Sequence, residues 1–150
     1  MRRRYVTSIA LALAVVVSAG TAVVAVAQQA APSGGDYKTA PPGGDYKKVS
    51  TLVALPDFVP GLGTLYVDPK TLPAGPFLAY DKQGQLVSSV YMIPVKDIEG
   101  HKAFNDLAVA KDRVDHVDMY YNAGHPGVAE PHYHVVIWYV SPQKAAALKQ

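Results

Sequence analysis

The 150-residue sequence contains no cysteine. This absence excludes disulfides, thiolate metal ligands, a cysteine nucleophile and the lipid-carrying cysteine of a bacterial lipoprotein. Basic runs are also scarce, and after the first few residues the longest is Lys47-Lys48. Because nucleic acids and anionic membrane surfaces require a basic patch, we expect neither as a partner.

The first 27 residues have the pattern of a secretory signal peptide. Arg2-Arg3-Arg4 precede an apolar run over residues 9–17, and Ala25-Val26-Ala27 forms a small-x-small cleavage site. The competing interpretation is an uncleaved anchor, because residues 9–27 are long enough to span a bilayer. Cleavage is the preferred interpretation. It predicts a periplasmic or secreted protein without a membrane partner. The cleaved chain would contain 11 basic and 12 acidic residues and would therefore be nearly neutral.

Residues 28–48 are rich in glycine and proline and contain a short repeat. The segment Gly34-Gly35-Asp36-Tyr37-Lys38 recurs as Gly43-Gly44-Asp45-Tyr46-Lys47. Such a segment has too little apolar surface to order itself, so a disordered linker is predicted. It serves either as a flexible spacer, which we favour, or as a tyrosine-bearing docking tether. Residues 49–150 then form a single domain with one core.

The pattern of this domain is mainly β, of the α+β type. Short strands are expected over residues 52–55 and 64–67, followed by a hairpin of residues 77–80 and 85–93 around a turn at residues 81–84. We therefore predict an antiparallel sheet or a small barrel with one or two peripheral helices.

Two segments carry helix signals. Asp97 is a candidate cap for a helix whose apolar positions recur every three or four residues as far as Ala108, although Gly100 weakens it. Ser141 and Pro142 form a cap and first-turn pair for a short helix at the C-terminal end of the sequence.

Four of the five histidines lie in a second predicted hairpin. Its two arms, near residues 115–121 and 132–140, are rich in β-branched and aromatic residues, and the loop between them is rich in glycine and proline. His116 and Asp118 lie two residues apart on one arm, and His132 and His134 lie two residues apart on the other. Since residues i and i+2 of a strand point to the same side, each pair projects together.

The register decides whether the two pairs meet. We expect Asp118 opposite His134, which places His116 diagonal to His134. A slip of one residue would send His116 and Asp118 to the other face. The clustered register is preferred because it gives the core an apolar face consisting of Val117, Met119, Tyr121, Tyr133, Val135, Ile137 and Tyr139.

Imidazoles and a carboxylate in one place indicate a divalent metal site. The predicted ligands are His116, Asp118, His132 and His134. His125 and Glu130 are expected either to form hydrogen bonds with these ligands or to exchange with them at the metal. This ligand set suits Zn, Cu, Fe or Mn. The simpler alternative is a solvated strand face on which Asp118 forms an ordinary salt link with a histidine.

The hairpin motif resembles a known family. His116-x-Asp118, the turn Gly124-His125-Pro126-Gly127 and Pro131-His132-Tyr133 resemble an uncharacterised family of exported bacterial proteins from Thermus and other bacteria, some of them regulated with envelope-stress sigma factors. The resemblance extends over about residues 52–140. It implies an acid where this chain has His134 and a histidine near Val136, and the chain departs from the family at both positions. The resemblance implies a domain and an export route rather than a reaction.

Pro131-His132-Tyr133-His134 also resembles the first metal motif of the cupins. In that motif a glycine lies six residues before the first histidine and a glutamate follows the second. Here Gly127 lies five residues before His132, and no glutamate follows His134. A cupin is therefore a fold-level alternative only.

Three functional hypotheses follow. The first, which we prefer, is an exported domain that binds a divalent metal without catalysis. The second is a metal-dependent enzyme with cupin-like oxygenase or hydrolase chemistry, in which Asp118 or Glu130 acts as the base. The third is a structural homo-oligomeric envelope protein whose exposed aromatic residues form the interface.

Overall fold

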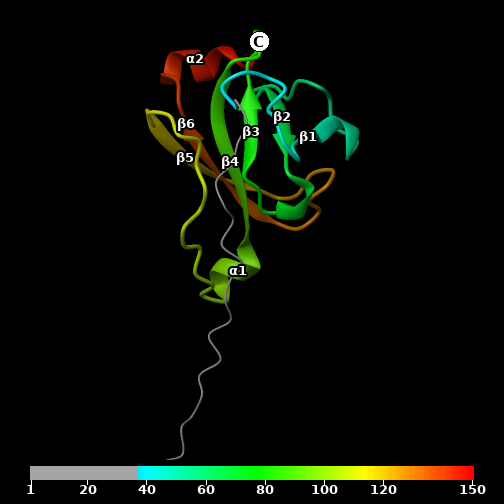
Figure 1. The fold of residues 1–150 in the computed structure, drawn as a ribbon. Coiled ribbons are helices and arrows are strands. Elements are labelled where there is room, and N and C mark those ends of the chain that lie inside the picture. The colour runs from blue at the N-terminus through cyan, green and yellow to red at the C-terminus, as the bar shows by residue number, and fades with distance from the viewer. Residues whose placement is uncertain (1–36) are drawn as a thin grey trace, which may run out of the picture.

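The computed structural model describes residues 37–150 as one six-stranded antiparallel sheet with the strand order β1-β2-β3-β4-β6-β5 (Figure 1). The strands are β1 (Lys47–Lys48), β2 (Thr64–Val67), β3 (Phe77–Tyr80), β4 (Leu86–Pro94), β5 (His116–Asn122) and β6 (His132–Trp138). The predicted mainly β fold is confirmed, and the sheet is open rather than closed into a barrel. The predicted signal peptide lies outside the described residues.

The β3–β4 hairpin forms the centre of the sheet. Its turn is held by Asp81, whose carboxylate accepts the backbone N–H groups of Gln83 and Gln85 at 3.0 and 2.8 Å. All nine residues of β4 are buried, because β3 and β6 flank it and other segments cover both of its faces. This hairpin and the short strand β2 lie where the sequence predicts them.

Of the two predicted helices, only one has the expected extent. α2 (Pro142–Ala147) begins as predicted, and the Ser141 hydroxyl accepts the N–H of Lys144. In contrast, α1 (Val95–Glu99) is a short helix that ends at Gly100, so the prediction of a helix reaching Ala108 is wrong. Neither helix of residues 37–150 has the length and apolar character of a membrane span.

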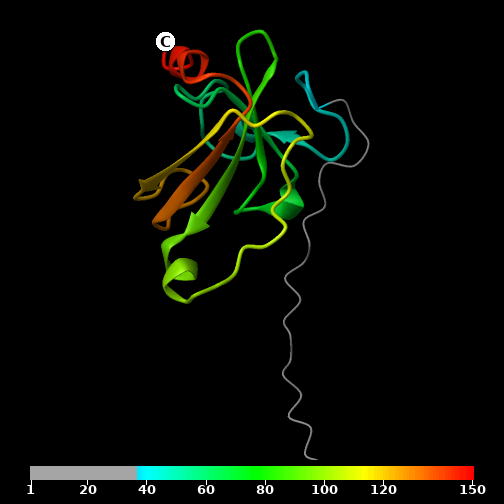
Figure 2. The same ribbon diagram turned by 90° about the vertical axis from the view of Figure 1, so that its left-hand side faces the viewer.

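Residues 100–115 follow α1 as an irregular connection. Figure 2 shows this connection running from α1 back along the sheet to the start of β5. His101 and Asp106 adopt positive φ angles of 54° and 53°, which an α-helix does not contain. The strand predicted over residues 52–55 is also absent, because the chain there leaves the 3-10 turn η1 (Val49–Thr51) in an irregular conformation. A second 3-10 turn, η2 (Pro69–Thr71), comes after β2.

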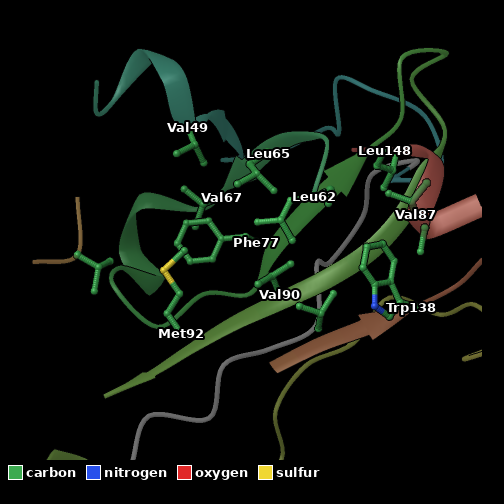
Figure 3. Packing of buried hydrophobic residues seen from close by; sticks show 14 residues of the cluster. Val49, Leu62, Leu65, Val67, Phe77, Val87, Val90, Met92, Trp138 and Leu148 are labelled. Atoms are coloured by element: carbon green, nitrogen blue, oxygen red, sulfur yellow. The ribbon is translucent and has the colours of Figure 1, made fainter. Parts of the chain in front are cut away.

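The larger hydrophobic core lies on one face of the sheet. Figure 3 shows side chains from β2, β3, β4 and β6 meeting residues of η1 and of the segment after α2. On β6, the residues that face this core are Val136 and Trp138, which are 0% and 4% exposed. His132 and His134 point to the same side, so the predicted apolar core face of the final hairpin is the wrong face. Three residues of that predicted face, Val117, Met119 and Tyr121, are 55–58% exposed.

The opposite face of the sheet is covered in part by residues of the predicted linker. The two tyrosines of the repeat, Tyr37 and Tyr46, pack against a second cluster that includes Leu78 and Tyr80. The Tyr80 hydroxyl donates to the carbonyl of Tyr37 at 2.7 Å, and the Tyr37 hydroxyl accepts the N–H of Lys111 at 2.9 Å. Packed structure therefore begins before the predicted boundary at residue 49.

Ser88 and Ser89 on β4 form a natural pair for a stability test. Both are fully buried, but the Ser88 hydroxyl has no hydrogen-bond partner among the described residues, whereas the Ser89 hydroxyl bonds to that of Tyr139 at 2.8 Å. We expect Ser88→Ala to raise the free energy of unfolding by about 1 kcal/mol, since it removes an unsatisfied buried hydroxyl. Ser89→Ala should lower it by about 1 kcal/mol. Urea denaturation measures both, and destabilisation by Ser88→Ala would contradict the first expectation.

Candidate metal centre

The two strands of the final hairpin pair in a register shifted by two residues from the predicted one. Tyr120 lies opposite His134, Asn122 opposite His132, and Asp118 opposite Val136. The predicted pairing of Asp118 with His134 is therefore wrong. A shift of two residues keeps every side chain on its predicted side, so the histidines and Asp118 still share one face of the sheet.

Three histidines converge on this face. The Nε2 atom of His134 lies 3.0 Å from Nε2 of His132 and 3.3 Å from Nε2 of His125. One ring nitrogen of each residue lies within 4.8 Å of those of the other two, which is close enough for a single metal ion to bind all three. His132 and His134 are buried, with 0% and 4% of their surface exposed, and His125 is half-buried.

His125 reaches the cluster because the loop folds back over β6. Its backbone pairs with Val128 through two hydrogen bonds of 2.9 and 3.0 Å. Gly124 and Gly127 on either side have φ angles of 127° and 90°, where glycine is favoured. A Cβ atom at Gly124 would lie 2.5 Å from the carbonyl oxygen of Ala129, so the tight turn excludes a side chain there. The sequence gives His125 only a supporting role beside the ligands, whereas the fold brings it into the cluster.

The hydrogen bonds of two rings fix their tautomers. Nδ1 of His132 lies 2.7 Å from the carbonyl oxygen of Glu130, and Nδ1 of His125 lies 3.0 Å from that of Pro126. Because a carbonyl oxygen only accepts, each Nδ1 carries the hydrogen and donates it. In the neutral rings, Nε2 of His125 and of His132 therefore presents a lone pair. A backbone carbonyl on the second ring nitrogen is a common partner of a metal-bound histidine.

Tyr120 completes the arrangement at the third ring. Its hydroxyl lies 3.1 Å from Nδ1 of His134 and can either donate to that atom or accept from it. When it accepts, Nε2 of His134 is free of hydrogen, and all three Nε2 lone pairs are available to one ion. Tyr120 is not among the site residues that the sequence predicts. The signal that could have identified its role is its place two residues after Asp118, on the same face of the strand.

Burial keeps the central imidazole neutral. Loss of solvent is the main cause that lowers the pKa of His134 to about 4, and neighbouring His132 and His125 lower it further. At neutral pH the ring is therefore unprotonated, which is the state that a metal ligand requires.

His116 and Asp118 lie farther along β5, beside Trp138. The His116 ring stacks on the indole at a centroid distance of 5.8 Å, and its Nδ1 atom lies 2.9 Å from the carboxylate of Asp115. Asp118 accepts the indole N–H of Trp138 at 2.8 Å. Glu130 forms an ion pair of 2.6 Å with Lys96. The structure thus gathers two of the four predicted ligands with His125 and places the other two in a separate set of contacts.

A cavity of about 900 Å³ adjoins the histidines. The β5–β6 hairpin supplies a polar wall that includes His116, Asp118, Tyr120, His125 and His134. The rest of the wall is largely apolar and comes from η1, the segment of residues 59–62, strands β2 to β4 and α2. An ion bound by the three histidines would therefore border a mainly apolar cavity.

Comparisons with known proteins give a family but no activity. Residues 81–121 match the family model TTHB210-like, described as hypothetical protein TTHB210. The crystal structure of hypothetical protein TTHB210 from Thermus thermophilus is 48% identical, with a TM-score of 0.57, and the match covers 64% of this chain and 89% of that chain. No curated protein matches. The predicted resemblance to a Thermus family is confirmed, whereas its link to envelope stress stays a prediction. The matched residues of the family model end before His125.

The lowered pKa of His134 predicts a pH dependence of stability in the metal-free protein. The pKa is about 4 in the fold, against 6.5 as the ordinary value. Between these values the unfolded chain binds a proton that the folded chain does not, so the free energy of unfolding should fall as the pH falls from 6.5 to 4. The expected loss is roughly 3 kcal/mol, and above pH 6.5 this contribution is fully present.

Denaturation at a series of pH values, in the presence of a chelator, measures this loss. His134→Gln is the matched control, because the amide is polar but does not titrate in this range. The variant should show a flatter pH profile, and a profile as steep as that of the wild type would assign the dependence to other groups.

Proposed function

This chain belongs to the TTHB210-like family, and we propose that it binds a divalent transition-metal ion through His125, His132 and His134. The observation that carries the proposal is the convergence of three imidazole nitrogens, two of which have their second ring nitrogen bonded to a backbone carbonyl. Hydrogen bonds alone explain the cluster poorly. The Nε2 atom of His134 carries at most one hydrogen, which it can donate fully to Nε2 of only one of its two neighbours, His125 or His132. A single cation, in contrast, accepts the lone pairs of all three nitrogens.

The ligand set favours Zn²⁺ or Cu²⁺ over Mn²⁺. Three neutral imidazoles suit zinc and copper, whereas manganese prefers carboxylate and water oxygens. The carboxylates of Asp118 and Glu130 are bonded to Trp138 and Lys96, so they lie outside the proposed ligand set. Three histidines leave one position of a tetrahedral zinc ion open, and that position would adjoin the cavity.

We favour binding over catalysis. A hydrolytic mechanism uses a general base within reach of the metal's open position. Asp118 and Glu130, the two candidates, are each engaged by the partner named above. We further propose that the protein acts outside the cytoplasm, because its N-terminal residues have the pattern of a signal peptide and it has no cysteine that an oxidising compartment would affect.

Metal content tests the proposal. The untagged protein, dialysed against Zn²⁺ and then against buffer, should retain close to one zinc per chain by elemental analysis. His132→Ala and His134→Ala should each lose most of this zinc, and His125→Ala should weaken binding by about 10- to 1000-fold, as expected for the loss of one of three ligands.

His116→Ala is the matched control, because His116 lies on the same sheet face but outside the cluster. It should retain the zinc. Loss of zinc in His116→Ala but not in His125→Ala would support the ligand set predicted from the sequence instead. Circular dichroism of each metal-free variant separates ligand loss from unfolding.

A homo-oligomeric envelope module is a second candidate, and one observation favours it. β5 is an edge strand, and its outer face exposes Val117, Met119 and Tyr121. Exposed apolar side chains on an unpaired strand edge are typical of an interaction surface. Analytical ultracentrifugation with and without chelator tests this role. An assembly that Met119→Lys dissociates while zinc stays bound would make the two functions independent.

A further inference from the structure

We propose that the cavity beside the metal centre binds a small amphipathic carboxylate, with its carboxylate on the metal ion and its apolar chain inside the cavity. This inference rests on the proposed metal site and adds the class of ligand. It follows from three observations: the cavity is large and mainly apolar, most of its polar side chains lie on one wall with Lys149 as the charged residue outside it, and that wall contains two of the three histidines.

The cavity has the size and surface of a small-molecule site. Its volume of about 900 Å³ lies within the range of about 300–1,000 Å³ in which proteins bind drug-sized compounds. Its deep wall includes Leu65, Val67 and Phe77, all of them nearly fully buried. Leu52 and Leu72 also line it and are 42% and 44% exposed, so apolar side chains continue to its mouth. Such a wall stabilises an aliphatic chain by removing it from water.

The polar wall fits a carboxylate head. A divalent ion on three neutral histidines carries two uncompensated positive charges, which an anionic oxygen partly neutralises. Metal binding through Nε2 also leaves the hydrogen of His134 on Nδ1, so the Tyr120 hydroxyl accepts it and can direct its own hydrogen elsewhere. The metal ion and the Tyr120 hydroxyl can then hold the two oxygens of one carboxylate.

Asp118 is the acidic group in this wall, and its surroundings limit its repulsion of an anion. Its carboxylate accepts the N–H of Trp138, and the Nε2 atom of His116 lies 3.9 Å away. Asp118 comes two residues before Tyr120 on β5, about 7 Å farther from the head site along the strand. The positive charge of the metal ion would repel a ligand with a cationic head. The metal-loaded polar wall therefore favours an anion.

Isothermal titration with dodecanoate and dodecanol, which share a chain and differ in the head, tests the inference. Dodecanoate should bind the zinc-loaded protein at least tenfold more tightly than the chelator-treated protein, whereas dodecanol should bind both equally. Tyr120→Phe keeps the ring but removes the hydroxyl, so at full zinc occupancy, checked by elemental analysis, it should weaken dodecanoate binding several-fold. In the Co²⁺-substituted protein, dodecanoate but not dodecanol should change the visible absorption of the metal.

The outcomes separate this inference from the function on which it rests. Stoichiometric zinc, combined with a dodecanoate affinity that zinc does not change, overturns the carboxylate ligand and leaves metal binding intact. A Co²⁺ spectrum that dodecanoate leaves unchanged overturns it as well. Failure to bind zinc or Co²⁺ at all overturns both proposals.

Discussion

The structure depends on how two imidazoles are accommodated on the core side of β6. His132 and His134 occupy positions that continue the row of Val136 and Trp138, and burying polar rings there is unfavourable unless their nitrogens are satisfied. The Glu130 carbonyl and the Tyr120 hydroxyl satisfy the outer nitrogens. The inner nitrogens face one another and His125, which is the geometry that a metal ion would complete.

This arrangement joins the site to the core. Met92 lies opposite His134 on β4 and belongs to the hydrophobic cluster, so the position of His134 is set by sheet pairing and by packing together. His125 comes from a loop, where the conformation depends on Gly124 and Gly127. The centre thus has two ligands on a rigid strand and a third on a turn. Ion binding would tie that turn to the sheet.

The separation of His116 and Asp118 from the cluster has a physical cause. Trp138 lies directly opposite His116, and its indole gives the imidazole a stacking surface and Asp118 a hydrogen bond. These contacts hold both side chains at the far end of β5. They still lie in the wall of the cavity, so they can influence a ligand there without binding the metal.

The alternation of residue types by itself determined the β3–β4 and β5–β6 hairpins and the shared face of the histidine pairs, and the Ser141-Pro142 pair determined the start of α2. These features depend only on neighbours in the chain. Only the tertiary structure decided which face of β6 is buried, since both faces are rich in apolar residues and the covering segments come from elsewhere. It also decided the two-residue shift of register, which preserves the alternation and so leaves no trace in the pattern. His125 reaches the histidine cluster because Gly124 and Gly127 adopt positive φ angles, which glycine permits but does not require.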